Sequence, residues 1–504
     1  MHFPVNTLSS VLQPSSPTHD AVIIPDGPKV TYRDFAAEVE RLAALLAGAG
    51  IQRQRAVSIV LPNGLEFMSV FLAVARAGAI AAPLNSAYTD DEFKFYMEDA
   101  TSQLVILPPG PHEARTAAAQ LGIPVMEASL DGARVRLVKD GLPLTRQKDP
   151  APPSPDDVAL FLHTSGTTSR PKGVPLRHSN LMASLGNIKA TYKLTPDDVS
   201  LIVMPLFHVH GLLGAALSTL SSGGAIAIPP KFSASQFWPL QKTTRANWFS
   251  AVPTIHQVLL MQPKDESQRN CFRFIRSCSS ALAPAVLEKM ESRFNTPVLE
   301  AYGMTEASHQ MSSNPLPPGT RAPGTVGAGT GVQIGIFDMD RPGTMLTTGQ
   351  RGEVVIRGPN VTKGYNNNPK ANAESFVNGW FRTGDQGFLD DRGYLTLTGR
   401  IKELINRGGE KVSPLEVDAA LLQHPGVAEA VCFGVPDQMF GECVQAAVVL
   451  KGDADEAALR AFCAERLAKF KVPDRIYIAE ALPRTATGKV QRRHVAAAFA
   501  GKKQ

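Results

Sequence analysis

The sequence predicts an α/β fold with a large N-terminal domain of parallel-sheet layers, a small β subdomain and a small C-terminal α+β domain. The chain has 504 residues, which is too long for one hydrophobic core. Between residues 158 and 301 short apolar runs alternate with helical patterns. Such alternation is typical of parallel sheets covered by helices. From about Gly352 the pattern changes to short strands and tight turns.

The first block of the chain ends at a Pro-rich joint, residues 149–155. Before this joint, the apolar run Ala56–Leu61 predicts a strand and the segment Phe67–Ala77 predicts a helix. We therefore expect an α/β block before the joint and a second one after it.

The second block contains five apolar runs that predict buried strands: Val158–Leu162, Val199–Met204, Trp248–Val252, Phe274–Cys278 and Val298–Ala301. Leu181, Leu185, Ile188 and Tyr192 recur at helical spacing, which predicts a helix after the first run. Another helix is expected after His210, and prolines 253 and 284 stand where helices are expected to begin. Ligands of such sheets gather at the carboxyl ends of the strands.

The third block predicts a β-rich subdomain. Short strands are expected at 353–357, 387–389 and 394–398, and residues 390–393 suit a hairpin turn. After Arg400 the α/β pattern returns. We therefore predict an N-terminal domain at residues 1–400 and a C-terminal domain at residues 401–504.

Composition excludes several classes of function. The chain is 43% hydrophobic and 19% charged, and its net charge of +5 is not clustered as nucleic-acid binding requires. No apolar run is long enough to cross a bilayer, so no membrane partner is expected. Five cysteines without a CxxC pair predict free thiols in a reducing compartment. Neither a secretory signal nor a peroxisomal address is recognised, so the cytoplasm is expected. The sequence gives no oligomeric state.

The strongest single feature is the segment from Thr164 to Gly173, Thr-Ser-Gly-Thr-Thr-Ser-Arg-Pro-Lys-Gly, which follows an expected strand. Its hydroxyls, its glycines and Lys172 are the groups that hold a polyphosphate. It is not a Walker A loop, because the Gly-Lys-Ser/Thr ending is absent. A flexible linker is the alternative, but linkers rarely follow a buried strand.

This segment resembles the phosphate loop of the acyl-adenylate-forming superfamily, which includes acyl- and aryl-CoA synthetases, peptide-synthetase adenylation domains and luciferases. Four more segments resemble motifs of that superfamily in the same order: Tyr302–Glu306, Thr383–Asp385, Gly399–Lys402 and Pro483–Lys489. The resemblance covers nearly the whole chain. It implies an enzyme that uses ATP, Mg²⁺ and coenzyme A to activate a small carboxylic acid.

The resemblance also implies roles for individual residues. The residues expected to bind ATP are Thr164, Ser165, Gly166, Thr167, Thr168, Lys172, Tyr302, Gly303, Thr305, Asp385, Arg400 and Lys489. Thr305, Glu306, Lys489 and His208 are expected to be catalytic.

Most of these side chains have an ordinary alternative role. Tyr302 offers an aromatic face to a purine or packs in the core. Glu306 holds Mg²⁺ or is a surface carboxylate. Asp385 accepts from two ribose hydroxyls or belongs to a turn between strands. Arg400 donates to the nucleotide or is an exposed charge. Lys489 neutralises charge between the acid and the α-phosphate or is solvated.

The superfamily also implies a mobile C-terminal domain. The expected hinge is Lys402, about which the domain takes one pose for adenylate formation and another for thioester formation. Gly408 and Gly409 are expected to leave room for the pantetheine arm of coenzyme A in the second pose. An ordinary turn is the alternative for these glycines.

The acid pocket is expected near His208, Ser279, Ser280 and His309, whose polar groups suit a small acid with a second charge. His208 also suits a gate to this pocket, and His210 suits a helix cap. Segments 162–175, 311–317 and 406–411 resemble the oxalate–CoA ligase branch of the superfamily.

Oxalate is therefore the expected acid. The alternatives are a medium-chain fatty or aryl acid, an adenylation domain that loads a carrier protein, and a non-catalytic ATP-binding sensor.

Overall fold

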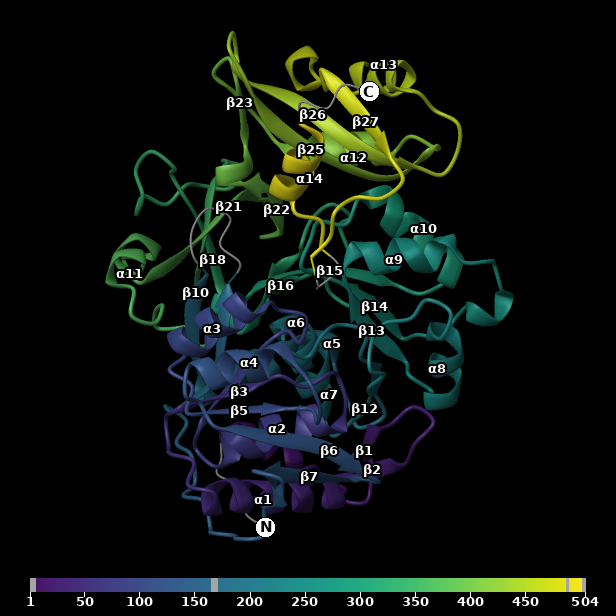
Figure 1. Cartoon of the computed structure of the whole chain (residues 1–504). Helices are drawn as coiled ribbons and strands as arrows, with labels where there is room; N and C mark the ends of the chain where they lie inside the picture. Colours follow the sequence, from purple (N-terminus) through teal and green to yellow (C-terminus); the bar gives the residue numbers. More distant parts are fainter. Residues whose placement is uncertain (1–5, 165–170, 486–488, 501–504) are drawn as a thin grey trace.

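The computed structural model describes residues 6–164, 171–485 and 489–500. Three sheets precede Ile401, and a fourth sheet lies in the C-terminal part of the chain (Figure 1). These features confirm the expected α/β fold class, with a large N-terminal part and a small C-terminal part.

The first sheet has nine strands and holds most of the expected second block. Its order is β17 (Ala328–Gly329), β16 (His309–Ser313), β15 (Val298–Met304), β14 (Phe274–Ser277), β13 (Trp248–Ala251), β11 (Val199–Leu201), β12 (Ala225–Ala227), β1 (Asp20–Ile23) and β2 (Lys29–Thr31). The strands from β15 to β1 pair in parallel, while β16, β17 and β2 pair antiparallel. All five expected strands of this block are present, four of them in this sheet.

The second sheet has eight strands and holds most of the first block. Its order is β10 (Lys172–Arg177), β9 (Val158–Thr164), β4 (Ile80–Pro83), β3 (Ala56–Ile59), β5 (Leu104–Leu107), β6 (Val125–Asp131), β7 (Arg134–Lys139) and β8 (Leu142–Pro143). The candidate phosphate segment joins β9 to β10, which pair antiparallel with Thr164 opposite Lys172. The sequence predicted a strand, a loop and then a helix at this point, and the intervening strand β10 corrects that prediction.

Helices pack between and around these two sheets. They are α1 (Tyr32–Gly48), α2 (Leu65–Arg76), α3 (Asp90–Asp99), α4 (Glu113–Gln120), α5 (His178–Tyr192), α6 (Val209–Gly211), α7 (Ser218–Ser221), α8 (Phe237–Thr244), α9 (Pro253–Met261) and α10 (Pro284–Phe294). A π-helical turn, η2 (Leu212–Leu217), joins α6 to α7, and 3₁₀ turns stand at η1 (Leu8–Leu12), η3 (Glu266–Gln268) and η4 (Thr305–Ala307).

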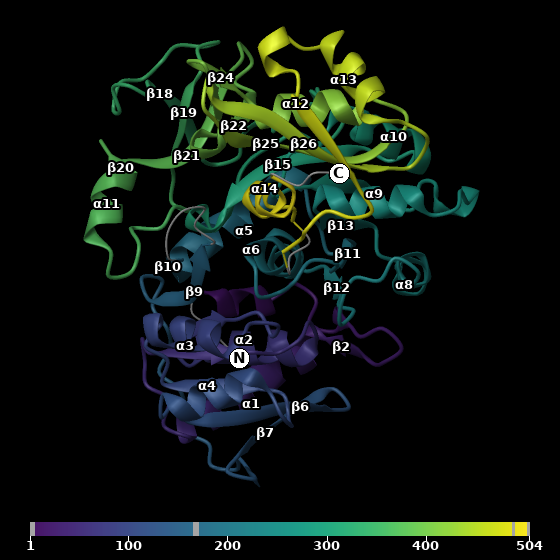
Figure 2. The same cartoon turned by 45° about the horizontal axis from the view of Figure 1, so that its top comes forward.

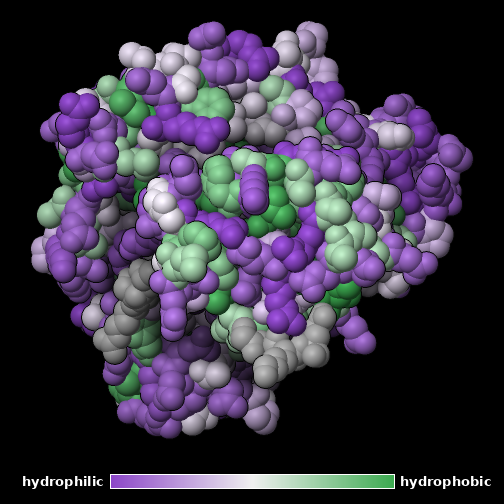
Figure 3. Space-filling view, turned by 90° about the horizontal axis from the view of Figure 1, so that it is seen from above, coloured by the Kyte–Doolittle hydropathy of each residue, from purple (hydrophilic) through white to green (hydrophobic). Residues whose placement is uncertain are grey.

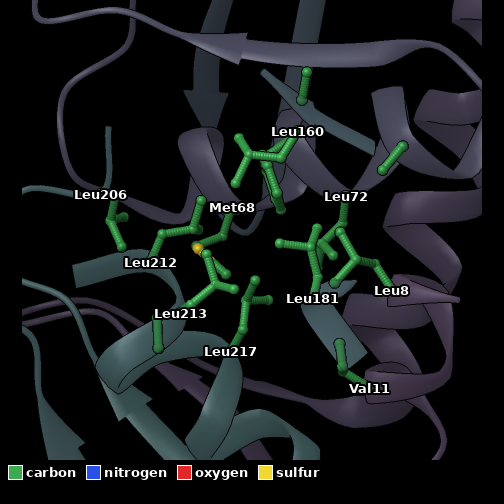
Figure 4. Packing of buried hydrophobic residues seen from close by; sticks show 14 of the residues in the cluster. Leu8, Val11, Met68, Leu72, Leu160, Leu181, Leu206, Leu212, Leu213 and Leu217 are labelled. Atoms are coloured by element: carbon green, nitrogen blue, oxygen red, sulfur yellow. The ribbon is translucent and has the colours of Figure 1, made fainter. Parts of the chain in front are cut away.

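One hydrophobic core joins the two large sheets. Leu160 of β9, Met68 of α2, Leu181 of α5 and Leu213 of η2 pack together in it with the apolar face of η1 (Figure 4). Fully burying a side chain of this kind contributes about 1.5–3 kcal/mol. The core therefore fixes η2, and with it the histidines that precede η2, against the second sheet.

The third sheet contains β18 (Gln333–Phe337), β19 (Gly352–Arg357), β20 (Phe376–Val377), β21 (Trp380–Leu389) and β22 (Leu395–Arg400), with α11 (Pro369–Ser375) beside it. Its strands pair antiparallel, and the expected hairpin turn joins β21 to β22. β21 is longer than predicted, because the segment Thr383–Asp385 lies within it.

The fourth sheet contains β23 (Ile405–Arg407), β24 (Glu410–Val412), β25 (Val427–Asp437), β26 (Gly441–Leu450) and β27 (Arg475–Ala479). Helices α12 (Pro414–Leu422), α13 (Glu456–Ala464) and α14 (Arg492–Phe499) and the 3₁₀ turn η6 (Lys469–Lys471) accompany it. The turn η5 (Ile401–Glu403) connects this sheet to β22.

The C-terminal part sits on top of the larger part, over the ends of β15 and β14 (Figures 1 and 2). The outer face seen from above is mostly hydrophilic (Figure 3). No helix in the described part of the chain combines the length and the apolar character that a membrane span requires. The segment before α14 runs down toward β15 and α9, which brings the C-terminal part to the candidate site (Figure 1).

Candidate active site

Three side chains expected to bind the nucleotide meet where β15, β21 and β22 come together. Asp385 and Arg400 are directly opposite residues of β21 and β22. Arg400 Nε lies 3.0 Å from Asp385 Oδ1, and the hydroxyl of Tyr302 donates to Asp385 Oδ2. Because opposite residues on one face of an antiparallel pair lie close together, the strand register creates this ion pair.

The local backbone holds Asp385 in place. Gly384 has φ +73°, a conformation that favours glycine, and its N–H donates to Glu353 Oε1 at 3.1 Å. The Thr383 hydroxyl accepts from the N–H of Asp385 at 3.1 Å. The segment is therefore an irregularity within β21, and the alternative of a turn between strands is wrong.

Burial raises the pKa of Asp385, while Arg400 and the Tyr302 hydroxyl act in the opposite direction. The negative charge of Asp385 in turn raises the pKa of Arg400. Among the described residues this buried carboxylate has two partners, so it retains lone pairs that can accept from ligand hydroxyls. This arrangement suits the two hydroxyls of a ribose.

A second charged group lies in η4. Glu306 is 5% exposed, and the hydroxyl of Tyr365 donates to its Oε1 at 2.7 Å. Lys172 Nζ lies 4.0 Å from the centre of the Tyr365 ring. Burial raises the pKa of Glu306, opposed by Tyr365 and Lys172, and burial also lowers the pKa of Lys172. Both charges would be stabilised by ligands of opposite sign, which suits a cation at Glu306 and phosphate oxygens at Lys172.

The backbone beside Glu306 is tightly packed. Thr305 is buried in η4, and a Cβ at Gly303 would lie 2.2 Å from the carbonyl oxygen of His309. Since real Cβ atoms do not approach so closely, position 303 requires glycine for His309 to sit where it does.

Lys489 enters this site from the C-terminal part. Burial lowers its pKa to about 8, and the charge of Arg400 adds to this effect. Lys489 in turn lowers the pKa values of His208 and His309, although burial is the larger cause for both. Because the charge of Lys489 lowers the pKa values of His208 and His309, which stand far earlier in the chain, Lys489 lies close to both residues at the expected acid pocket.

Two histidines have different structural roles in this pocket. The Nδ1 atom of His208 accepts from the N–H of His210 at 3.2 Å and caps α6. The helix cap that the sequence suggested, His210, is therefore wrong, and His208 is the cap of α6. The His210 ring instead lies between Ser250 and Ser279, with Nε2–Oγ and Nδ1–Oγ distances of 2.6 and 3.0 Å. Burial lowers the pKa of His208 to about 3 and also lowers the pKa of His210 well below its ordinary value, so both rings are neutral.

His309 is 2% exposed and begins β16 with φ +97°. Neither of its ring nitrogens has a hydrogen-bond partner from another residue in the described ranges. Its ring meets that of His210 edge to face, with centroids 5.3 Å apart. Buried donors and acceptors are nearly always paired, so these nitrogens are candidates for binding a ligand. Ser280, by contrast, is exposed and donates to the carbonyl oxygen of Ser279.

Several expected site residues are not in this cluster. Thr164 is the last residue of β9, and Ser165, Gly166, Thr167 and Thr168 lie outside the described residues. Gly408 and Gly409 are exposed at the turn between β23 and β24, where the N–H of Gly408 donates to the carbonyl oxygen of Phe440. Lys402 lies in η5 and acts electrostatically on Lys172.

The structure adds two side chains that sequence reasoning missed. Tyr365 follows no recognisable motif, and only its contact with Glu306 identifies it. Arg276 is completely buried beneath the acid pocket and contacts Ser250. Its position inside a run predicted to be a buried strand was a usable signal, because charged residues are rarely buried without a function or a partner.

Comparisons with known proteins match nearly the whole chain. The sequence pattern described as AMP-binding enzyme matches residues 13–366, and that of the AMP-binding enzyme C-terminal domain matches residues 416–489. The chain is 49% identical to an oxalate–CoA ligase of Arabidopsis thaliana, over 98% of this chain and 99% of that protein. It is 47% identical to an oxalate–CoA ligase of Saccharomyces cerevisiae, over 95% and 94% of the two chains.

A solved structure shares the fold over its full length. ATP-bound MatB from Rhodopseudomonas palustris superposes with a TM-score of 0.90 at 32% identity, covering 98% of this chain and 99% of that one.

Proposed function

The chain belongs to the AMP-binding enzyme family, and from this premise we propose that it is an ATP-dependent acid–CoA ligase whose acid is oxalate. The observation that carries the proposal is the position of Lys489. It reaches from the C-terminal part into a pocket of neutral histidines, within the electrostatic range of Arg400. A lysine in this position links a nucleotide site to an acid site, which adenylate formation requires.

We propose that ATP binds across this site with its ribose hydroxyls at Asp385 and its phosphates near Lys172 and the loop that begins at Thr164. The pairing of Asp385 with Arg400 and Tyr302 supports the ribose assignment. Glu306 would hold Mg²⁺, a hard cation that accepts one carboxylate together with phosphate oxygens. When bound, the ion neutralises charge on the leaving pyrophosphate.

The first half-reaction joins the acid to the nucleotide. A carboxylate oxygen of the acid attacks the α-phosphorus, the bond to the β-phosphate oxygen breaks, and pyrophosphate leaves. Both reactants are anions, so the protein must offset their repulsion and align them. Lys489 donates to the oxygens between which negative charge accumulates, and Thr305 would donate to the α-phosphate. The product is an acyl-adenylate with an activated carbonyl.

The second half-reaction forms the thioester. The thiolate of coenzyme A attacks that carbonyl, and the carbon–oxygen bond to AMP breaks. Since Lys489 occupies the site in this pose, we propose that the C-terminal domain, residues 401–504, rotates about Lys402 relative to residues 1–400. Gly408 and Gly409 would then line the path of the pantetheine arm. Both glycines are exposed in the pose of this structure, which is consistent with a role in thioester formation and not in adenylate formation.

Oxalate is favoured by the polar lining of the pocket. Ser279, His208 and the unpartnered nitrogens of His309 are groups that can bind a second carboxylate. An alkyl or aryl acid would leave them unpaired at a cost of roughly 1–3 kcal/mol each. The two oxalate–CoA ligases described above, nearly half identical over full length, point to the same acid.

A panel of acids tests the proposal. We expect acid-dependent AMP release with coenzyme A to be fastest with oxalate, slower with malonate and glyoxylate, and slowest with hexanoate and cinnamate. A preference for hexanoate or cinnamate would contradict the polar-pocket argument. Absence of ATP–pyrophosphate exchange with every acid would favour a nucleotide sensor. Transfer to a carrier protein but not to coenzyme A would favour a loading domain.

We also propose a cytoplasmic location. All five cysteines are free, as is usual in a reducing compartment. Fractionation of the native host should recover the enzyme with cytosolic markers, and recovery in peroxisomes or mitochondria would contradict this.

A further inference from the structure

Arg276 is a positive charge placed inside the protein without a negative partner. It lies in β14 with 0% exposure. Its three nitrogens donate to the Tyr192 hydroxyl at 2.8 Å, the Ser250 hydroxyl at 2.9 Å and the Gln310 side-chain oxygen at 3.0 Å. These three partners are neutral, the Cys278 side chain also acts on the guanidinium, and among the residues that the structure describes Arg276 forms no ion pair with a carboxylate. Such a charge is costly to keep out of water, so its retention points to a function.

The contact with Ser250 leads toward the acid pocket. Ser250 Oγ lies 2.6 Å from His210 Nε2, and His210 Nδ1 lies 3.0 Å from Ser279 Oγ. Arg276, Ser250, His210 and Ser279 therefore form one continuous chain of hydrogen bonds. Its inner end is a fixed cation, and its outer end is a partly exposed hydroxyl at the pocket.

The cation sets the direction of every bond in this chain. A guanidinium can only donate, so Ser250 Oγ accepts from Arg276. A hydroxyl polarised in this way is a stronger donor, and the nearby charge favours the lone pair of His210 Nε2 over an N–H at that position. His210 is neutral, because burial, His309 and Arg276 all lower its pKa. Its single ring proton is therefore on Nδ1 and is donated to Ser279.

We propose that Arg276 is a positioning residue that, through Ser250 and His210, turns the hydroxyl proton of Ser279 toward the second carboxylate of the acid. This inference rests on the proposed function and deepens it, because it names the part of the protein that selects a dianion. Ser279 accepts from His210 and so has its own proton left for the substrate. The charge of Arg276, which no carboxylate of the described residues neutralises, favours a negative group at the end of the chain.

A monoanion of the same size would use its only carboxylate at the α-phosphate. It would offer the Ser279 proton a neutral oxygen at best, and it would place no negative group at the end of the chain from Arg276. Glyoxylate is such an acid, since an aldehyde replaces one carboxylate of oxalate. The ratio of kcat/KM for oxalate to kcat/KM for glyoxylate therefore measures the effect of the chain.

Two variants test the proposal kinetically. Arg276→Gln removes the charge, and Ser250→Ala breaks the chain while keeping Arg276. We expect both to lower the oxalate-to-glyoxylate ratio by roughly 10- to 100-fold, as for a hydrogen bond to a charged group, and to leave the KM for ATP unchanged. The matched control is Arg273→Gln, which removes a nearby arginine whose charge is neutralised by Asp198. An equal loss of activity toward both acids in Ser250→Ala would overturn the proposal.

A spectroscopic readout separates this inference from the choice of substrate. In ¹⁵N-histidine-labelled full-length enzyme without ligands, assigned with a His210→Asn variant, we expect His210 to carry its proton on Nδ1. In Ser250→Ala we expect both tautomers. A proton on Nε2 in the unaltered enzyme would overturn the inference whatever acid is used. If oxalate is not activated, the proposed function fails, while the tautomer still decides the role of Arg276.

Discussion

At the scale of single residues, Lys489 sets the pH range of the first half-reaction. Burial lowers its pKa to about 8, so the ligand-free enzyme loses this charge at moderately alkaline pH. The anions of bound ATP and acid raise the pKa again. We therefore expect kcat/KM for ATP–pyrophosphate exchange to fall above about pH 8, and the alkaline limb of kcat to lie at higher pH.

Withdrawal of the segment that carries Lys489 does not explain such a fall in kcat/KM. A lysine in water has a pKa of 10.5, so the withdrawn pose binds more protons than the inserted pose between about pH 8 and 10.5. Raising the pH in this window therefore stabilises insertion. The control is Lys489→Arg, whose guanidinium stays charged. Exchange by this variant should be slower, but its kcat/KM should not fall at alkaline pH. If kcat/KM of the variant fell over the same pH range, another group would be responsible for the titration.

At the scale of elements, apolar runs predicted the sheets well because buried parallel strands are nearly continuous in hydrophobic residues. Val158–Leu162 and Phe274–Cys278 became β9 and β14 with small changes at their ends. The strand β10 was missed, since its apolar residues are few and Pro175 interrupts them. Hydrophobicity along one segment does not show which strand that segment pairs with, whereas the hairpin between β21 and β22 was predicted from its turn residues.

The site was predictable to the extent that its residues stand in recognisable motifs. Asp385 and Arg400 belong to two such motifs, and strand register brings them together. Tyr365 and Ser250 belong to none, because their contribution depends on contacts between segments far apart in the chain. The roles assigned to the motif residues stay predictions until ligands are bound or variants are measured.

The turn between β23 and β24 yields an element-scale prediction. Gly409 has φ +91°, and no atom lies within 4 Å of a Cβ built there. Gly409→Leu should spare ATP–pyrophosphate exchange, because the turn is outside the site in this pose. It should slow thioester formation on the order of 10²-fold by displacing the pantetheine arm.

Gly393→Leu is the matched control for this variant. Gly393 is also exposed with positive φ, +76°, and with open space around its Cβ, but it lies in the hairpin turn of the third sheet. Both variants incur similar backbone strain. If Gly393→Leu slowed thioester formation as much as Gly409→Leu, strain rather than obstruction of coenzyme A would be the cause.

At the scale of the whole molecule, the placement of the C-terminal part decides which half-reaction the enzyme can perform. Arg484 lies in the segment that carries Lys489, and it contacts both parts of the protein. It donates to Thr254 Oγ1 of α9 at 2.9 Å and forms an ion pair with Glu429 of β25. These contacts fasten the lysine segment to the N-terminal part in the pose for adenylate formation.

Removing the contact of Arg484 with the N-terminal part should therefore shift the equilibrium from the pose for adenylate formation to the pose for thioester formation. Thr254→Ala deletes the acceptor of an exposed hydrogen bond, worth about 0.5–1 kcal/mol. ATP–pyrophosphate exchange should fall roughly two- to five-fold, the change that this free energy produces in an equilibrium between poses. Thioester formation from supplied oxalyl-adenylate should be equal or faster, because the second pose gains population. Since a general loss of stability slows both steps together, parallel decreases in the two rates would mean that Thr254 supports the fold and not the pose.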